Sequence, residues 1–111
     1  MVLFATDIKI IGNHFSGTVN GDRIIYLRQF DGVIISENTF LSDTTYSLVI
    51  FGCKHSLISN NSITGSVTYH IVLDLPQDNN YVIVYNILTN ATTSAITGDT
   101  ADMQIAHNIT Q

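Results

Sequence analysis

The chain has few of the residues that would assign it to a specialised class of protein. Its 111 residues include one cysteine, one proline and no tryptophan, and only 12% of them are charged. The lone Cys53 excludes an internal disulfide, and its apolar surroundings predict a small core residue. Since this share of charge is about half the usual one, we expect Ser, Thr, Asn and aliphatic residues at most outward positions.

Basic residues are scarcest, and the formal net charge is −5. The four of them are scattered along the chain: Lys9, Arg23, Arg28 and Lys54. Such spacing cannot neutralise a run of phosphates, so we expect neither nucleic acid nor an anionic membrane as a partner. No apolar stretch reaches the roughly 20 residues that cross a bilayer, which excludes a membrane-spanning helix.

What the chain has instead is a recurring asparagine. Five copies follow one another at steps of 25, 23, 25 and 22 residues: Asn13, Asn38, Asn61, Asn86 and Asn108. Isoleucine lies three residues before each copy, and an apolar residue lies two after it in four of them. A fixed period of this size predicts a solenoid, in which each coil buries its apolar face by stacking on its neighbours.

Strands and corners account for each repeat. The two-residue period of a strand places the isoleucine in the interior, and the apolar residue after the asparagine breaks that alternation. We therefore expect the chain to turn at the asparagine, a residue that accepts a left-handed backbone. A second aliphatic strand follows at 24–27, 47–50, 70–73 and 94–97. The sequence predicts an all-β parallel β-helix of about four and a half coils.

This pattern resembles the right-handed parallel β-helix family, which includes pectate lyases, polygalacturonases, mannuronan epimerases and bacteriophage tailspikes. Apolar-x-Ile-x-x-Asn-x-(Phe/Ile/Leu) recurs every 22 to 25 residues over nearly the whole chain. The resemblance implies a right-handed solenoid and says little about activity, because the fold carries many functions. We interpret residues 1–111 as a single β-helix segment of a longer chain, or one that another subunit caps.

The asparagine column itself has two interpretations. A polar stripe at intervals of about 4.8 Å could bind sugar hydroxyls. Alternatively, the amides form a ladder that bonds to itself and to turn backbone, which would otherwise be buried without partners. We favour the ladder.

Two carboxylates are the candidates for catalysis. Asp74 and Asp99 each lie thirteen residues after an asparagine, so stacking places their backbones about 5 Å apart. That separation suits a retaining glycosidase, or a Ca²⁺ site if Asp78 and Asp102 join them. The alternative is a pair of solvated acids at a turn. The motifs that resemblance to polygalacturonases, pectate lyases or epimerases would require are missing, and we expect no other metal and no cofactor.

Two further outward columns are candidate contact surfaces. Glu37, Asn60, Tyr85 and His107 each precede an asparagine and are candidates for binding in a groove. Ile34, Leu57 and Val82 form an apolar column that a solvated face does not need, which indicates a contact surface. Since tailspike-like β-helices associate as trimers, the resemblance implies a homotrimer. The alternatives are a covering loop and a simple aliphatic surface stripe, favoured for its β-propensity.

The hypothesis that we favour is a structural, carbohydrate-engaging segment of a viral or bacterial surface appendage, whose partner is a cell-surface glycan. Its place would be a virion appendage or the cell exterior. The first alternative is a fragment of a polysaccharide hydrolase or lyase that uses Asp74 and Asp99. The second is a purely architectural repeat that binds no ligand.

Overall fold

The computed structural model describes residues 5–17, 23–42, 46–74, 81–98 and 103–110, which form twelve strands. The strands are β1 Ala5–Ile11, β2 His14–Gly17, β3 Arg23–Arg28, β4 Phe30–Ser36, β5 Thr39–Ser42, β6 Tyr46–Phe51, β7 Lys54–Ser59, β8 Ser62–Asp74, β9 Tyr81–Val84, β10 Ile87–Gly98, β11 Met103–Ala106 and β12 Ile109–Thr110. Among these residues no helix is long and apolar enough to span a membrane.

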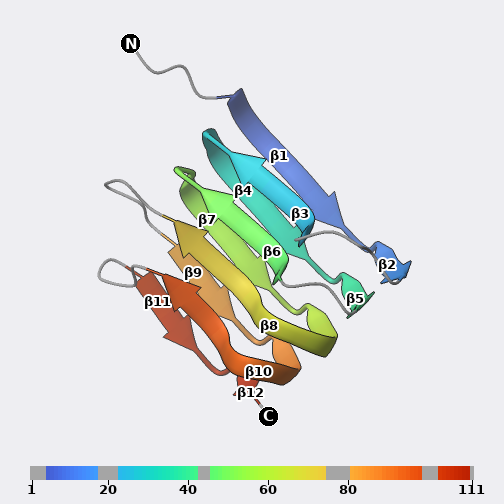
Figure 1. Ribbon diagram of the computed structural model, residues 1–111. Helices are drawn as coiled ribbons and strands as arrows, with labels where there is room; N and C mark the ends of the chain where they lie inside the picture. The colour runs from blue at the N-terminus through green and yellow to red at the C-terminus, as the bar shows by residue number, and fades with distance from the viewer. Residues whose placement is uncertain (1–4, 18–22, 43–45, 75–80, 99–102, 111) are drawn as a thin grey trace.

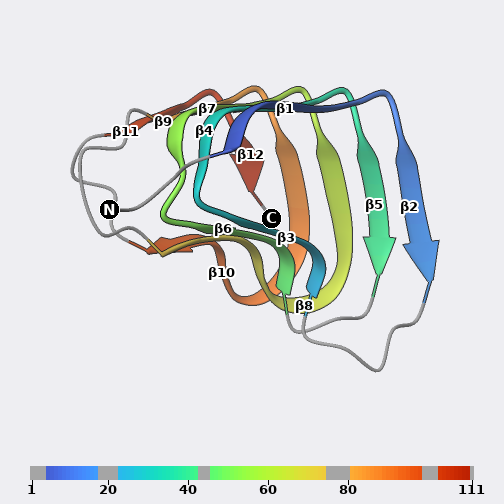
Figure 2. The ribbon, with the colours of Figure 1, turned by 90° about the horizontal axis from the view of Figure 1, so that it is seen from above.

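The strands form a parallel solenoid with three faces around one interior (Figures 1 and 2). The first sheet holds the strands before the asparagines, in the order β1-β4-β7-β9-β11. The strands after the asparagines follow in the order β2-β5-β8-β10-β12. Strands β3 and β6 and the far halves of β8 and β10 make the third face, here called the second-strand face.

The interior follows the predicted register. Ile35 pairs with Ile58, and Ile58 pairs with Ile83; all three side chains are 0% exposed. Of the apolar residues after the asparagines, Phe40, Ile63 and Leu88 are buried with them. Phe15 is half-buried, and its ring stacks on that of Phe40 with centroids 4.9 Å apart. An uninterrupted apolar column therefore runs along the solenoid axis and stabilises the stack of coils.

The ends of this column are less buried than its middle. Ile10 is half-buried and Ile105 is 39% exposed, although both occupy the same place in the repeat as the isoleucines of the central coils. Each end coil has a neighbour on one side only among the described residues, so its inward side chains pack against one coil instead of two.

The position of the turn differs from the prediction. The left-handed residue is the one before each asparagine, with φ between 56° and 73°: Gly12, Glu37, Asn60, Tyr85 and His107. The asparagines do not have positive φ, because their backbone N–H and their side chain both serve the ladder described below. Glu and Tyr are poor residues for a left-handed backbone, which costs about 1–2 kcal/mol for such residues, whereas glycine, asparagine and histidine adopt it more readily.

The number of coils is also slightly lower than predicted. The described strands close about three turns rather than four and a half. Among the described residues the second-strand face holds four segments, which gives three steps between neighbouring coils.

Candidate functional site

The asparagines form a continuous hydrogen-bonded ladder inside the corner between the first sheet and the strands that follow. In the central steps Asn38 Nδ2 donates to Asn61 Oδ1 at 3.1 Å, and Asn61 Nδ2 donates to Asn86 Oδ1 at 3.0 Å. The same oxygens accept the backbone N–H of the preceding asparagine, at 3.0 Å in both cases. Since only an oxygen can accept that N–H, the backbone fixes the orientation of each amide.

The second hydrogen of each amide supports the coil before it. Asn38, Asn61 and Asn86 donate to the carbonyl oxygens of Ile10, Ile35 and Ile58 at 2.8–3.0 Å. The three central amides are at most 2% exposed. With their hydrogens and oxygens already bonded inside the protein, they offer nothing to a sugar hydroxyl, and the ladder is structural.

A comparison with protein families agrees with this architecture. The family model described as "right handed beta helix region" matches residues 2–111. The chain belongs to the right-handed β-helix family. Comparisons with curated proteins and with solved structures give no match. The fold of this right-handed β-helix chain is thus shown, whereas a likeness to tailspikes or pectate lyases in particular is not.

The structure brings the predicted binding column together at an outer corner of this β-helix. Glu37, Asn60, Tyr85 and His107 are all exposed, and each occupies the left-handed position of its own coil. Tyr85 is 59% exposed, and its ring stacks on that of His107 with centroids 5.2 Å apart and planes 8° apart. The left-handed backbone points these side chains away from the interior, so the corner carries a polar and aromatic row.

The structure does not test the predicted catalytic pair, because it describes neither the side chain of Asp74 nor Asp99. Asp74 ends β8 and its backbone pairs with Phe51 on the second-strand face, whereas Asp99 lies outside the described residues. Asp78 and Asp102 also lie outside them. Among the described residues there is no group of three His, Cys, Asp or Glu side chains that could hold a metal ion. Catalysis by Asp74 and Asp99 remains a hypothesis from the sequence.

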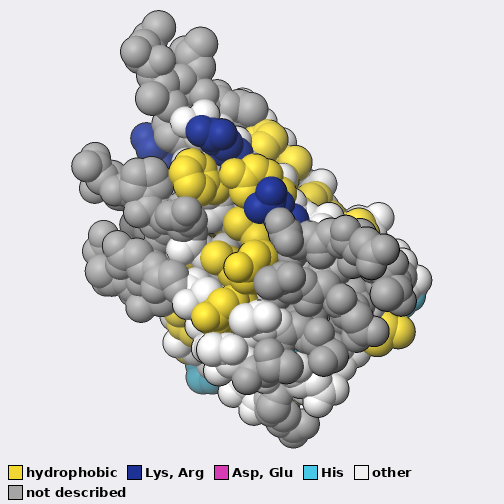
Figure 3. Space-filling model, viewed as in Figure 1, with side chains coloured by type: hydrophobic (Ala, Val, Ile, Leu, Met, Phe, Trp, Pro, Cys, Tyr) yellow, Lys and Arg dark blue, Asp and Glu magenta, His cyan; other side chains and the backbone are white. Residues whose placement is uncertain are grey.

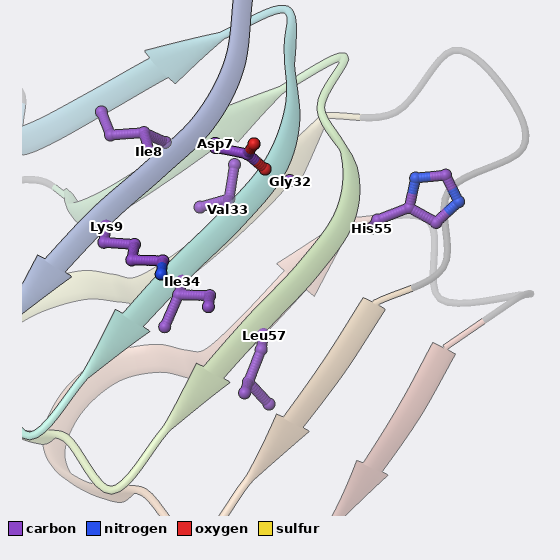
Figure 4. Close-up of a pocket in the computed structure, with 8 residues that line it drawn as sticks. All are labelled: Asp7, Ile8, Lys9, Gly32, Val33, Ile34, His55 and Leu57. Carbon is purple, nitrogen blue, oxygen red and sulfur yellow. The ribbon is translucent and has the colours of Figure 1, made fainter.

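The apolar column lies in register on the outer side of the first sheet. Ile34 pairs with Leu57 and Leu57 pairs with Val82, and all three are half-buried because each packs against the next. Beside them lies a hollow of about 240 Å³, where Gly32 contributes no side chain (Figure 4). Its lining residues are Asp7, Ile8, Lys9, Gly32, Val33, Ile34, His55 and Leu57.

The charged side chains around this hollow do not point toward a common centre where a ligand could bind. The ring of His55 points away from it (Figure 4) and its Nδ1 lies 2.7 Å from Asp31 Oδ1 in an exposed pair between neighbouring coils. The hollow is also lined by the carboxylate side chain of Asp7 and the ammonium side chain of Lys9. We interpret the hollow as a notch in the outer surface of the first sheet.

The sequence analysis did not predict one pair of buried polar residues. Ser47 and His70 lie directly before the inward Leu48 and Ile71, so strict alternation predicts that they point outward. Both are 0% exposed, and the pairs on either side, Tyr46 with Tyr69 and Leu48 with Ile71, place them in register. Alternation fails in both strands, because Ser47–Ile50 are buried in succession in β6 and His70 and Ile71 are buried in succession in β8. A serine and a histidine amid aliphatic residues were the only signal in the sequence.

His70 is held in its neutral form. Its Nε2 lies 2.7 Å from the carbonyl oxygen of Thr89, so Nε2 carries the hydrogen. Among the described residues Nδ1 and the hydroxyl of Ser47 have no hydrogen-bond partner. Burial lowers the pKa of His70, and the bond to Thr89 opposes that shift in part. A second proton would therefore be buried without an acceptor.

This arrangement predicts a loss of stability in mild acid. Because the pKa of His70 is lower in the folded than in the unfolded chain, the unfolded chain binds the proton first as the pH falls through about 6.5. The free energy of unfolding should fall by up to about 1.4 kcal/mol from pH 7.5 to 5.5. Urea melts of wild type and His70→Leu would measure it. The variant should lose less stability than wild type over this interval, and equal losses would contradict the assignment.

Proposed function

We propose that this β-helix segment is an architectural part of a surface appendage that engages carbohydrate along its outer corner. The exposed stack of Tyr85 and His107, in line with Glu37 and Asn60, is the observation that carries the proposal. The buried ladder beneath it supports a rigid scaffold, and the corner row supplies the groups that would meet a ligand.

The chemistry of this row suits a sugar chain. An aromatic ring offers an apolar surface to the C–H groups of a sugar, while a carboxylate and an amide bond to its hydroxyls. The four side chains recur once per coil, at intervals of about 4.8 Å along the axis. A repeating row favours an extended, repeating ligand over a compact one, because each coil offers one further contact.

Carbohydrate binding is tested on an array of immobilised neutral and acidic polysaccharides. We expect wild type to be retained on at least one of them and Tyr85→Ala to bind at least tenfold more weakly, since the ring is the largest exposed group of the row. Leu41→Ala is the matched control, because Leu41 is 51% exposed on another face and should leave binding unchanged.

The same array separates binding from catalysis. If no polysaccharide retains wild type, or if Tyr85→Ala binds as wild type does, the corner row is not a binding site. Release of reducing sugars that is lost in Asp74→Asn would instead support the enzyme hypothesis.

The apolar column on the first sheet suits contact between copies of the chain. Ile34, Leu57 and Val82 make a flat aliphatic strip beside the hollow, and Ile11, 49% exposed, extends it. Burying such a strip between chains removes apolar surface from water. We include a homotrimer around this face in the proposal, as the likeness to tailspike β-helices suggested.

Replacing Leu57 by Asp tests this contact. The new carboxylate would be buried without a partner in the interface. The free-energy cost of burying an unpaired charge is large enough to separate the chains. Sedimentation of wild type should show three associated chains, with Leu57→Asp shifted toward smaller species and an unchanged circular dichroism spectrum. Leu41→Asp, on another face, should sediment as wild type does. Indistinguishable profiles for wild type and Leu57→Asp would exclude the contact.

A further inference from the structure

The asparagine ladder is open at both ends of the described solenoid, and its two ends differ in chemistry. Every inner step runs in one direction, because an asparagine donates its backbone N–H and one Nδ2 hydrogen to Oδ1 of the asparagine one coil later. Asn13 makes both of these bonds to Asn38, while its own Oδ1 accepts no hydrogen bond from a described residue. The N-terminal end of the ladder therefore offers an acceptor.

The C-terminal end offers the matching donors. Asn108 Oδ1 accepts the backbone N–H and the Nδ2 of Asn86, both at 2.9 Å, and Asn108 Nδ2 donates one hydrogen to Ile83 O. In the part of the chain that the structure describes, the backbone N–H of Asn108 and its second Nδ2 hydrogen have no acceptor. Since an inner step joins these two donors to one Oδ1, the two ends are the two halves of a single step.

The backbone beside the ladder shows the same complementarity. In the inner steps the residue after an asparagine donates its N–H to the asparagine one coil earlier, as Ile109 does to Asn86 O at 2.8 Å. At the two ends of the described strands, the N–H of His14 and the carbonyl oxygen of Asn108 lack this partner. The outer strands of the first sheet, β1 and β11, also pair on one side only and lie at opposite ends of the solenoid (Figure 1). Each end thus presents what the other one lacks.

We propose that copies of this chain stack head to tail, with the C-terminal coil of one copy on the N-terminal coil of the next, so that the ladder and the first sheet continue across the junction. Asn108 then donates to Asn13 Oδ1 of the next copy, and His14 N–H of that copy donates to Asn108 O. The repeat aligns β11 with β1 and sets Ile105 against Ile10. Because the two surfaces differ, the contact is heterologous, and each added copy leaves the same pair of ends open.

The interior at both ends supplies apolar surface for this junction. Ile105 is 39% exposed at one end, and Ile10 and Phe15 are half-buried at the other, whereas their counterparts in the central coils are buried. Stacking would give each end coil a second neighbour and remove this apolar surface from water.

The C-terminal edge also lacks the features that keep a sheet edge from pairing. Proteins protect exposed edge strands with lysine and other charged residues, with proline or with bulges. Residues 104–110 contain no Lys, Arg, Asp, Glu or Pro, and β11 follows β9 in unbroken register. The Lys and Arg side chains that are visible in Figure 3 lie over the N-terminal coils, away from this edge. The N-terminal coil of another copy fits here, because it brings a parallel strand together with the acceptor that the ladder needs.

Sedimentation velocity and electron microscopy of the 111-residue chain test the stacking, with Leu57→Asp present throughout so that the strip on the first sheet cannot contribute. The starting protein should form a series of species that lengthens with concentration, instead of one closed oligomer. Each copy contributes five asparagines at steps of about 4.8 Å, so filaments should repeat about every 24 Å along their axis.

Asn13→Ala removes the acceptor at the junction. It should raise the dissociation constant of stacking at least tenfold, because two donors of Asn108 would be buried without a partner. Asn60→Gly is the matched control, since it alters an exposed asparagine away from both ends and should assemble as the starting protein does. Circular dichroism of both variants shows whether the fold is retained.

A cross-link tests the direction and the register of stacking. Lys9 and Gln104 are exposed and occupy the same outward position of the repeat, so stacking would set them opposite each other on adjacent strands, within reach of a disulfide. Lys9→Cys with Gln104→Cys should give a series of disulfide-linked multimers under mild oxidation, whereas Leu41→Cys with Gln104→Cys should not. The proposal is overturned if the starting protein is monomeric at every concentration, if folded Asn13→Ala assembles as the starting protein does, or if the two double variants cross-link alike.

Discussion

Asn61→Ala should lower the free energy of unfolding by about 3–5 kcal/mol, a large share of the stability of a domain of this size. Asn61 Oδ1 accepts both the backbone N–H and the Nδ2 of Asn38, and its own Nδ2 donates to Ile35 O. Removing the amide leaves three buried groups without partners, at about 1–3 kcal/mol for each before relaxation. Urea unfolding followed by circular dichroism measures the loss.

Two neighbouring substitutions make the result specific. Asn13→Ala removes the exposed end of the ladder, where Nδ2 donates to Asn38 Oδ1 and Ile11 O, and should cost less than about 1 kcal/mol. Asn60→Gly keeps the left-handed backbone that Asn60 adopts at φ 56° and should be nearly neutral. If Asn61→Ala and Asn13→Ala cost the same, the ladder is not the source of stability.

Ile58→Ala should cost about 2–5 kcal/mol, through lost burial and through the cavity that remains. Ile58 is 0% exposed in the middle of the interior column, between Ile35 and Ile83 of the neighbouring coils. Denaturant unfolding of the variant measures this cost, and an unchanged m-value would show that the extent of folding is the same.

The equivalent substitution at the end of the column is the control. Ile105 occupies the same place in the repeat but is 39% exposed, so Ile105→Ala should cost less than about half as much. Equal costs at the two positions would contradict the stacked-coil interior, because burial would then not depend on the neighbouring coils.

The repeat predicted most of the fold. Five isoleucines and five asparagines at one spacing determine which residues share a column, and stacking at a fixed step leaves little freedom in the register. The buried isoleucines of the central coils and the hydrogen-bonded asparagines confirm this part. The family match over residues 2–111 supports the same conclusion.

The corners could not be predicted so well. An asparagine that bonds to its neighbours and one that adopts a left-handed backbone look the same in a sequence, and the turn proved to lie one residue earlier, at residues as ill-suited as Tyr85. Burial of His70 was missed for a related reason, since a strand that buries successive residues breaks the alternation on which the prediction rests.

The candidate site is less determined by the repeat than the interior is. Outward positions have no stacking requirement that selects one residue type, so Glu37, Asn60, Tyr85 and His107 share a position without sharing a chemistry. Their alignment at one exposed corner followed from the period. The period does not determine their ligand, because the same scaffold can present any side chain at these positions.

Hydrogen exchange of the asparagine side chains tests the central claim most directly. In nitrogen-15 NMR spectra the Nδ2 hydrogens of Asn38, Asn61 and Asn86 should exchange with solvent far more slowly than those of the exposed Asn60 and Asn90, because the ladder holds the first three inside the coils. Equally fast exchange for all five asparagines would show that no buried ladder exists and would contradict the solenoid described here.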